Sequence, residues 1–316
     1  ADRLTEWATY GCPTRTGKPW TCDEMQAAID RGPHRSALSD EAIAHFKAEV
    51  DEKVRIGQAK LVAWEAIKDD PPTELKISPI VAIPHKSKQF RSILDLSFHL
   101  RLEPGQVLPS VNSTTVKMAP KGAIDHQLGH SLSRVIHAFA EMEDDARIFM
   151  AKWDIKDGFW RVDAEEGAEW NFSYVLPQTP GSPCLLVVPT SLQMGWVESP
   201  PFFCAASETA RDVAQDYCET KLGSLPTHKF THYVLGNPAY EERPEKDPTG
   251  RAFRYLLEVY VDDFVSLVIP TSREQLRHVS TGTMTGIHDV FPADDIDSND
   301  PISEKKLKQL DGEYAP

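Results

Sequence analysis

Residues 256–269 have the sequence LLEVYVDDFVSLVI, in which two aliphatic, β-branched runs enclose a pair of aspartates. Runs of this kind separated by two residues predict a β-hairpin, and we expect Asp262 and Asp263 to form its loop. Two-residue loops favour Asn-Gly or Asp-Gly, because their turns need positive φ. Adjacent carboxylates there are a local cost, and such costs concentrate at functional sites. A divalent cation with oxygen ligands would relieve the repulsion; a solvated acidic turn is the plain alternative.

Length and charge limit the classes of protein to consider. The 316 residues can form one large domain or two. A net charge of −14 argues against binding nucleic acid by overall charge, so any such binding would use local basic patches.

The five scattered cysteines contain no C-x-x-C and predict an intracellular protein of the cytoplasm or nucleus, not a secreted one. No apolar run is long enough for a membrane span, so we expect no membrane partner.

The first half of the chain predicts helices and strands around a basic loop. Residues 1–36 show no periodicity and predict an irregular extension. Ser39 is a good N-cap for a helix that ends near Gly57. Strands are expected at 77–83 and 92–96.

The segment between those two strands is basic. Residues 85–91 (HKSKQFR) supply three cations, Lys86, Lys88 and Arg91, which suit a polyphosphate ligand. A solvated hairpin tip is the plain alternative. Residues 101–121 predict a loop.

A buried strand ends on a carboxylate. Residues 124–139 predict a helix, and residues 148–155 predict a strand that is apolar on both faces. Asp154 lies at the end of this strand. A buried carboxylate is costly unless it is paired or binds a metal.

The second half predicts a hairpin, a long helix, and the Asp-Asp hairpin. Strands are expected at 170–176 and 184–188, followed by a loop and a helix that begins at Ser199. Residues 221–252 are polar and proline-containing and predict an insertion. Ser272 predicts the start of a helix that ends near Val290.

This order of features resembles the reverse transcriptases of retroviruses and long-terminal-repeat retrotransposons: basic loop, strand-end Asp, Gly-Trp loop with a Ser-Pro-started helix, then Tyr-x-Asp-Asp on a hairpin. The resemblance covers roughly residues 38–316. It implies an α+β right-hand polymerase fold, whose palm is an antiparallel sheet packed on helices, with fingers and an absent or incomplete thumb. It divides the chain into an N-terminal extension at 1–36, fingers at 37–105 and 163–198, and palm at 106–162 and 199–316.

The resemblance implies a two-metal site. Asp154 matches the first catalytic aspartate of the family, and Asp262 and Asp263 match the Tyr-x-Asp-Asp pair. With the Ile155 carbonyl they would hold two Mg²⁺ ions, for which Mn²⁺ could substitute. Asp262 is expected to bind both ions, and Asp263 is expected to assist it as a further ligand.

The resemblance also implies substrate contacts for deoxynucleoside triphosphates on an RNA or DNA template with a primer. Arg91 matches the arginine on the incoming nucleotide, and Lys86, or else Lys88, matches the lysine at the γ-phosphate. Phe159 matches an aromatic steric gate, since a ring under C2′ leaves no room for a 2′-hydroxyl.

The nucleotide-contacting loop departs from the family pattern. A gapless alignment places Met194, and not Gln193, against the residue that touches the nucleotide. Tyr260, the first residue of the hairpin motif, belongs with the substrate-binding residues. Lys306 or Lys308 matches a late basic residue that would assist pyrophosphate.

Three other functions stay open. An RNA-dependent RNA polymerase shares the paired aspartates but is expected to carry a smaller, polar residue in place of Phe159. A metal-dependent nuclease could use three aspartates but would not need the basic loop. A catalytically weak or inactive retroelement remnant that binds nucleic acid or protein partners is favoured by the −14 charge and the missing thumb.

Overall fold

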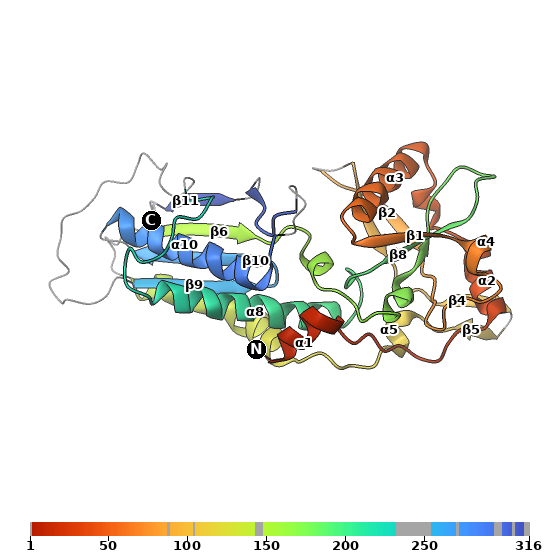
Figure 1. The fold of residues 1–316 in the computed structure, drawn as a ribbon, viewed down its shortest axis with the longest axis horizontal. Helices are drawn as coiled ribbons and strands as arrows, with labels where there is room; N and C mark the ends of the chain where they lie inside the picture. Colours follow the sequence, from red (N-terminus) through yellow and green to blue (C-terminus); the bar gives the residue numbers. More distant parts are fainter. Residues whose placement is uncertain are drawn as a thin grey trace. The chain divides into compact units, whose positions relative to one another are not determined.

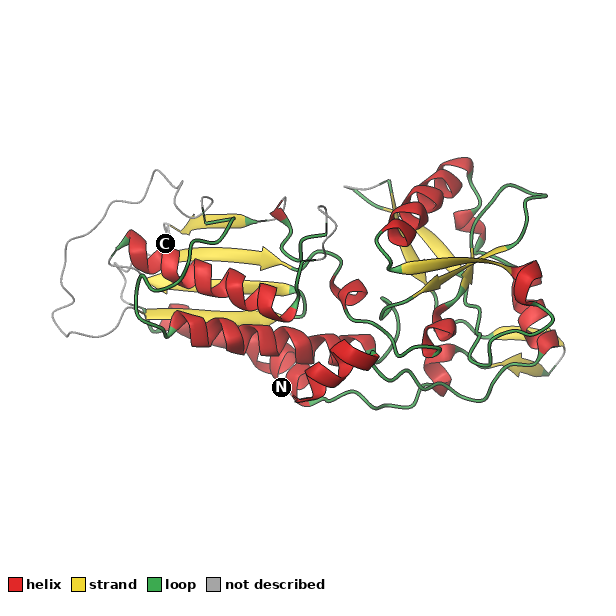
Figure 2. Cartoon of the chain, viewed as in Figure 1, coloured by secondary structure: helices red, strands yellow, loops and turns green. Residues whose placement is uncertain are grey.

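The computed structural model describes residues 2–86, 89–103, 105–142, 148–231, 254–269, 272–293, 299–304 and 307–312. The protein is a mixed α+β chain with antiparallel sheets (Figure 1, Figure 2). It divides into two compact units, one made of Ala1–Ala119 and Phe159–Phe202 and the other of Pro120–Gly158 and Phe203–Pro316.

The segment after residue 105 packs into the first unit. Val111 is buried in its core, and the Val116 N–H donates to the Arg15 carbonyl at 2.8 Å.

The N-terminal segment is not irregular, so that prediction was wrong. It forms helices α1 (Asp2–Tyr10) and α2 (Cys22–Arg31). Thr21 and Glu24 make a reciprocal capping box at the start of α2, and Met25 and Ala28 bury one face of this helix. Prolines and glycines between the helices obscured this local signal.

The rest of the first unit consists of short elements. Ser39 caps α3 as predicted, since its Oγ accepts from the Ala42 N–H at 3.2 Å. The strands pair as β1-β8-β7, β2-β3 and β4-β5. The elements are η1 (Arg35–Ala37), α3 (Asp40–Arg55), β1 (Ala59–Ala63), α4 (Trp64–Ile67), β2 (Ile80–Pro84), β3 (Phe90–Leu94), β4 (Leu100–Glu103), β5 (Gln106–Leu108), α5 (Val111–Thr114), η3 (Gly158–Arg161), η4 (Ala168–Phe172), β7 (Tyr174–Val175) and β8 (Leu185–Pro189).

Two sequence predictions in this unit were wrong. The expected loop at 101–121 contains the β4–β5 hairpin and the short helix α5. The expected strand at 170–176 is reduced to β7, because the residues before it form the 3₁₀ turn η4. The polar side chain of Asn171 stabilises that turn, since its Nδ2 donates to the Ala168 carbonyl at 2.9 Å.

The core of the first unit joins its helices to the start of a long helix. Phe46 and Val50 of α3 lie in one apolar cluster with Trp196 and Phe202. The Trp196 and Phe202 rings are stacked at 6.1 Å, and Trp7 of α1 meets Phe202 edge-on at 5.0 Å.

The second unit is a four-stranded antiparallel sheet in the order β11-β6-β10-β9 (Figure 1). The predicted helix at 124–139 is present, but a π-helical turn, η2, interrupts it. The elements are α6 (Gly122–His126), η2 (Gln127–Ser131), α7 (Leu132–Ala140), β6 (Ile148–Asp154), α8 (Ser199–Cys218, which begins in the first unit), β9 (Arg254–Tyr260), β10 (Asp263–Ile269), α10 (Arg273–Val290) and β11 (Lys308–Gly312).

Helices α8 and α10 pack on each other and on the sheet. Cys218 of α8 and Val279 of α10 share a buried cluster with Phe149 of β6. The two helices approach closely at Gly286, where a Cβ would lie 2.5 Å from backbone atoms of Ala214. Glycine at this position therefore permits the helix contact.

Some sequence predictions fall outside the described residues. They are the acidic turn after Met142, most of the 221–252 insertion, Lys88 and Lys306. Within the described ranges, none of the helices has the length and apolar character needed to cross a membrane.

Candidate carboxylate site

Two aspartates from distant parts of the sequence lie opposite each other in the sheet of the second unit. β6 and β10 pair with Asp154 against Asp263, followed by Trp153 against Phe264. Directly opposed residues of an antiparallel pair point to the same face, with Cβ atoms about 4.5–5.5 Å apart. Trp153 and Phe264 are fully buried, and a shift of one residue in either strand would turn its aromatic side chain to the opposite face of the sheet.

The loop of the Asp-Asp hairpin is one residue earlier than the sequence predicted. Tyr260 pairs with Asp263, so the two loop residues are Val261 and Asp262. Asp263 instead begins β10, because it is held in the ladder by β9 and β6 at once. Val261 has φ of 57°, which is unusual for a β-branched residue and costs on the order of 1–3 kcal/mol.

Two hydrogen bonds from neighbouring elements hold this loop. The Val261 N–H donates to Gln127 Oε1 at 2.9 Å, and the Ile155 N–H donates to the Asp262 carbonyl at 2.9 Å. The loop backbone is thereby attached both to η2 and to the residue after β6.

A lysine lies among the carboxylates. Lys152 Nζ is 2.8 Å from Asp263 Oδ2. The hydrogen bond to Asp263 raises the pKa of Lys152, and the charges of Asp263, Asp154 and Asp262 raise it further. All three aspartates therefore act on one ammonium group. Our sequence interpretation missed Lys152, although strand alternation places it on the same face as Asp154.

The donor atoms fit a hard cation. The carboxylates of Asp154, Asp262 and Asp263 and the Ile155 carbonyl are all oxygen ligands, which Mg²⁺ and Mn²⁺ prefer. In the described ranges no three His, Cys, Asp or Glu side chains already surround a common metal position. Asp263 is paired with Lys152, so a metal ion that binds Asp263 would compete with this lysine.

The end of β6 is supported by residues 299–304. The Lys156 N–H donates to the Pro301 carbonyl at 2.8 Å, and the Ser303 N–H donates to the Asp154 carbonyl at 3.1 Å. Asp300 attaches this segment to the rest of the unit through Lys229 and through His288, whose Nε2 lies 3.1 Å from Asp300 Oδ1.

A second histidine extends this chain of contacts. His288 Nδ1 lies 2.9 Å from His228 Nε2. Burial, followed by the charges of His288 and Lys229, lowers the pKa of His228 from 6.5 to about 4. Burial alone would raise the pKa of Asp300, but hydrogen bonds from Lys229 and His288 hold it below its ordinary value.

The first unit brings together two of the predicted substrate residues. Arg91 lies on β3, is exposed, and places Nη2 3.0 Å from the Met194 sulfur; Met194 is 41 % exposed. Lys86 is exposed in the β2–β3 connection. Gln193 is buried, and its Nε2 donates to the Ser191 and Leu192 carbonyls at 3.0 and 3.2 Å. Its side chain therefore stabilises its own loop, whereas Met194 is presented to solvent.

The remaining predicted residues are placed as follows. Phe159 is the first residue of the second segment of the first unit and packs, partly buried, against that unit's core. Tyr260 is half-exposed at the end of β9. Lys308 is the first residue of β11.

No protein-family model and no curated protein matches this chain.

Proposed function

We propose that this chain is the fingers and palm portion of an RNA-directed DNA polymerase with a right-hand fold, and that it joins deoxynucleotides to a primer by two-metal chemistry. The observation that carries the proposal is the register of β6 and β10. It sets Asp154 against Asp263 and leaves Asp262 in the adjoining loop.

Each residue has a definite role in this proposal. Asp154 and Asp262 would hold two Mg²⁺ ions, which when bound activate the primer 3′-hydroxyl and offset the charge of the departing pyrophosphate. Lys152 pairs with the Asp263 carboxylate and limits the repulsion among the three carboxylates. In the first unit, Arg91 and Lys86 would bind the triphosphate.

The charge of the chain indicates that its polymerase activity is weak, because its affinity for template and primer is low. A net charge of −14 disfavours the binding of template and primer, because their affinity depends largely on contacts with phosphate. We therefore expect the isolated chain to extend primers weakly and with low processivity. A remnant that only binds nucleic acid or protein is the second candidate.

Primer extension with Mg²⁺ tests the proposal, using RNA and DNA templates with either deoxynucleotides or ribonucleotides. Extension with deoxynucleotides on RNA that is abolished by Asp262→Asn supports it, while Asp216→Asn, an exposed acid on α8, serves as the matched control. Incorporation of ribonucleotides alone would point to an RNA polymerase. Template binding without extension by the wild-type chain would point to the remnant.

A further inference from the structure

Gln127 is a buried amide in the π-helical turn η2. It is fully buried and lies where the helical run departs from α geometry between α6 and α7. Its Nε2 lies 3.1 Å from the Cys204 carbonyl, 3.3 Å from Ser207 Oγ and 3.0 Å from Glu208 Oε2, all on α8. π-Helical turns of this kind are rare and occur frequently at functional sites.

The partners of Gln127 define which way its amide points. The Cys204 carbonyl can only accept a hydrogen bond, so it faces Nε2. The Val261 N–H can only donate, so it faces Oε1, at 2.9 Å. The amide thus links α8 to the loop of the hairpin with one orientation that satisfies both ends.

The loop residue that Gln127 contacts is the strained one. Val261 has positive φ, a conformation that glycine adopts freely and valine does not. Such conformations persist only where surrounding contacts impose them.

From these contacts we infer that Gln127 is a positioning residue, which holds Val261 in its strained conformation and thereby places the carboxylate of the next residue, Asp262, beside Asp154. The catalytic part of this inference rests on the proposed function. The structural part, that Gln127 imposes the loop conformation, does not.

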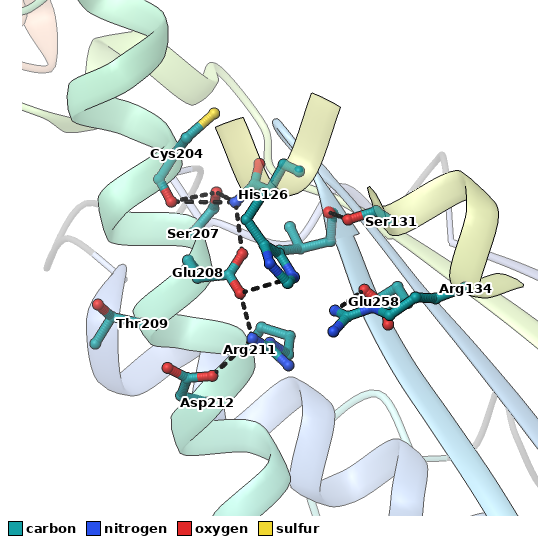
Figure 3. A network of polar contacts seen from close by, with 12 residues as sticks. His126, Ser131, Arg134, Cys204, Ser207, Glu208, Thr209, Arg211, Asp212 and Glu258 are labelled. Carbon is teal, nitrogen blue, oxygen red and sulfur yellow. Dashed lines mark hydrogen bonds and ion pairs between the residues drawn. The ribbon is translucent and has the colours of Figure 1, made fainter. Parts of the chain in front are cut away.

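A surrounding polar network keeps Gln127 in place. Figure 3 shows Glu208 of α8 between His126 and Arg211; Arg211 pairs with both Glu208 and Asp212. Glu208 is therefore restrained by its ion pair with Arg211 while it accepts from Gln127. The same region fastens β9 separately.

A hydrogen bond between η2 and β9 provides a matched control. Ser131 Oγ donates to the Val259 carbonyl at 2.9 Å (Figure 3). Ser131 thus lies in the same π-helical turn as Gln127 and bonds the same hairpin, but its hydrogen bond goes to Val259 and not to the loop residue Val261.

The experiment compares Gln127→Met, Ser131→Ala, Val261→Gly and the Gln127→Met/Val261→Gly double variant in the full chain. Methionine keeps the volume of glutamine and removes both hydrogen-bonding ends. Two readouts are taken: hydrogen exchange of the Val261 amide, which needs no activity, and kcat and KM for deoxynucleotide incorporation. Urea unfolding confirms that each variant is folded.

We expect Gln127→Met to speed exchange of the Val261 amide by about tenfold and to lower kcat by about tenfold, as the loss of one oriented hydrogen bond predicts. KM should stay within about twofold of the wild-type value. Ser131→Ala should change neither readout. In the Val261→Gly background, Gln127→Met should lower kcat by less, because glycine needs no support at positive φ.

Unchanged exchange of the Val261 amide in folded Gln127→Met would overturn the inference, as would an equal fall in kcat in both backgrounds. Faster exchange with unchanged kcat would overturn the catalytic part. If the wild-type chain does not extend primers, the proposed function is refuted. Faster exchange of the Val261 amide in Gln127→Met would in that case still support Gln127 as the residue that imposes the loop conformation. If Gln127→Met does not fold, the Val261→Gly variant provides the test. A kcat no lower than that of the wild type supports the inference that surrounding contacts impose the strained conformation on Val261, and a loss of activity overturns that inference.

Discussion

At the scale of single residues, Lys152 offsets part of the negative charge of the three aspartates. Its ammonium is bonded to Asp263 and is attracted by Asp154 and Asp262 as well. A cation entering this site would compete with it for the same carboxylates. The lysine therefore stabilises the metal-free site and weakens metal binding.

Replacing Lys152 with glutamine should strengthen cation binding. Removing one positive charge a few ångströms from the carboxylates is worth about 1 kcal/mol after screening, or about fivefold in affinity. Titration with Mn²⁺ followed by electron paramagnetic resonance measures this. Lys60→Gln is the control, since Lys60 also pairs with a carboxylate, Glu169, at 2.9 Å in the other unit. Weaker Mn²⁺ binding in Lys152→Gln would contradict the assignment of these aspartates to the metal.

Phe159→Val should admit ribonucleotides. If the ring excludes the 2′-hydroxyl, its loss should lower discrimination between deoxynucleotides and ribonucleotides by at least about tenfold. Competitive primer extension measures the ratio, and Phe159→Tyr, which keeps the ring, should retain the discrimination. Unchanged discrimination in Phe159→Val would remove Phe159 from the site.

The sequence predicted the aspartates but not the groups that hold them. Asp154 was found because a buried strand ends on it, and the hairpin pair because it replaces the usual glycine. Gln127 carried no such signal, since one polar residue in an apolar helix is common. The error in the loop position arose because Asp263 is kept in the ladder by contacts with β6, which is far away in sequence.

At the scale of elements, the pairing of α8 and α10 depends on small residues. Alanine usually stabilises a helix relative to glycine by about 1 kcal/mol. At Gly286 the opposite is expected, because the added Cβ would lie 2.5 Å from backbone atoms of Ala214, and such overpacking costs about 1–3 kcal/mol.

Urea unfolding of Gly286→Ala tests this close approach. The control is Gly129→Ala in η2, where no atom lies within 4 Å of the new Cβ. We expect a lower free energy of unfolding for Gly286→Ala and no loss for Gly129→Ala. Equal stability of the two variants would show that the helices lie further apart.

Strong periodic patterns predicted elements well, and short elements were missed. β6, β9, β10, α3 and α10 have clear apolar periodicity or caps, and their predicted positions were confirmed within a few residues. β1, β4, β5 and β11 were missed. β1 and β11 pair with strands far away in the sequence, for example Ala59 with Pro189, and local sequence does not show such contacts. β4 and β5 pair with each other, but they have only four and three residues, which is too short for a clear alternation.

At the scale of the whole molecule, contacts between distant segments make stability depend on pH. His228, His288 and Asp300 come from three separate parts of the second unit. The pKa of His228 is about 4 in the folded chain against 6.5 ordinarily. Stability from neutral His228 is therefore fully present above pH 6.5 and is lost as the pH falls from 6.5 towards 4.

The lowered pKa of Asp300 acts in the same direction at more acidic pH. We expect the free energy of unfolding to be lower at pH 5 than at pH 7, by about 1 kcal/mol from His228 after allowance for its partial exposure. Urea titrations at both pH values measure the difference, and His228→Gln should reduce it. The same pH difference in His228→Gln as in wild type would assign the effect to other groups.

The strand order of the second unit also has a consequence for how the protein is made. β6 emerges from the ribosome before both of its neighbours, β10 and β11, which lie more than a hundred residues later in the chain. Contacts between such distant segments close long loops and form late. Until β10 arrives, the apolar strand that carries Asp154 has no partner and is a target for aggregation or chaperones. The carboxylate site should accordingly be completed only after β10, more than a hundred residues after β6, has been synthesised.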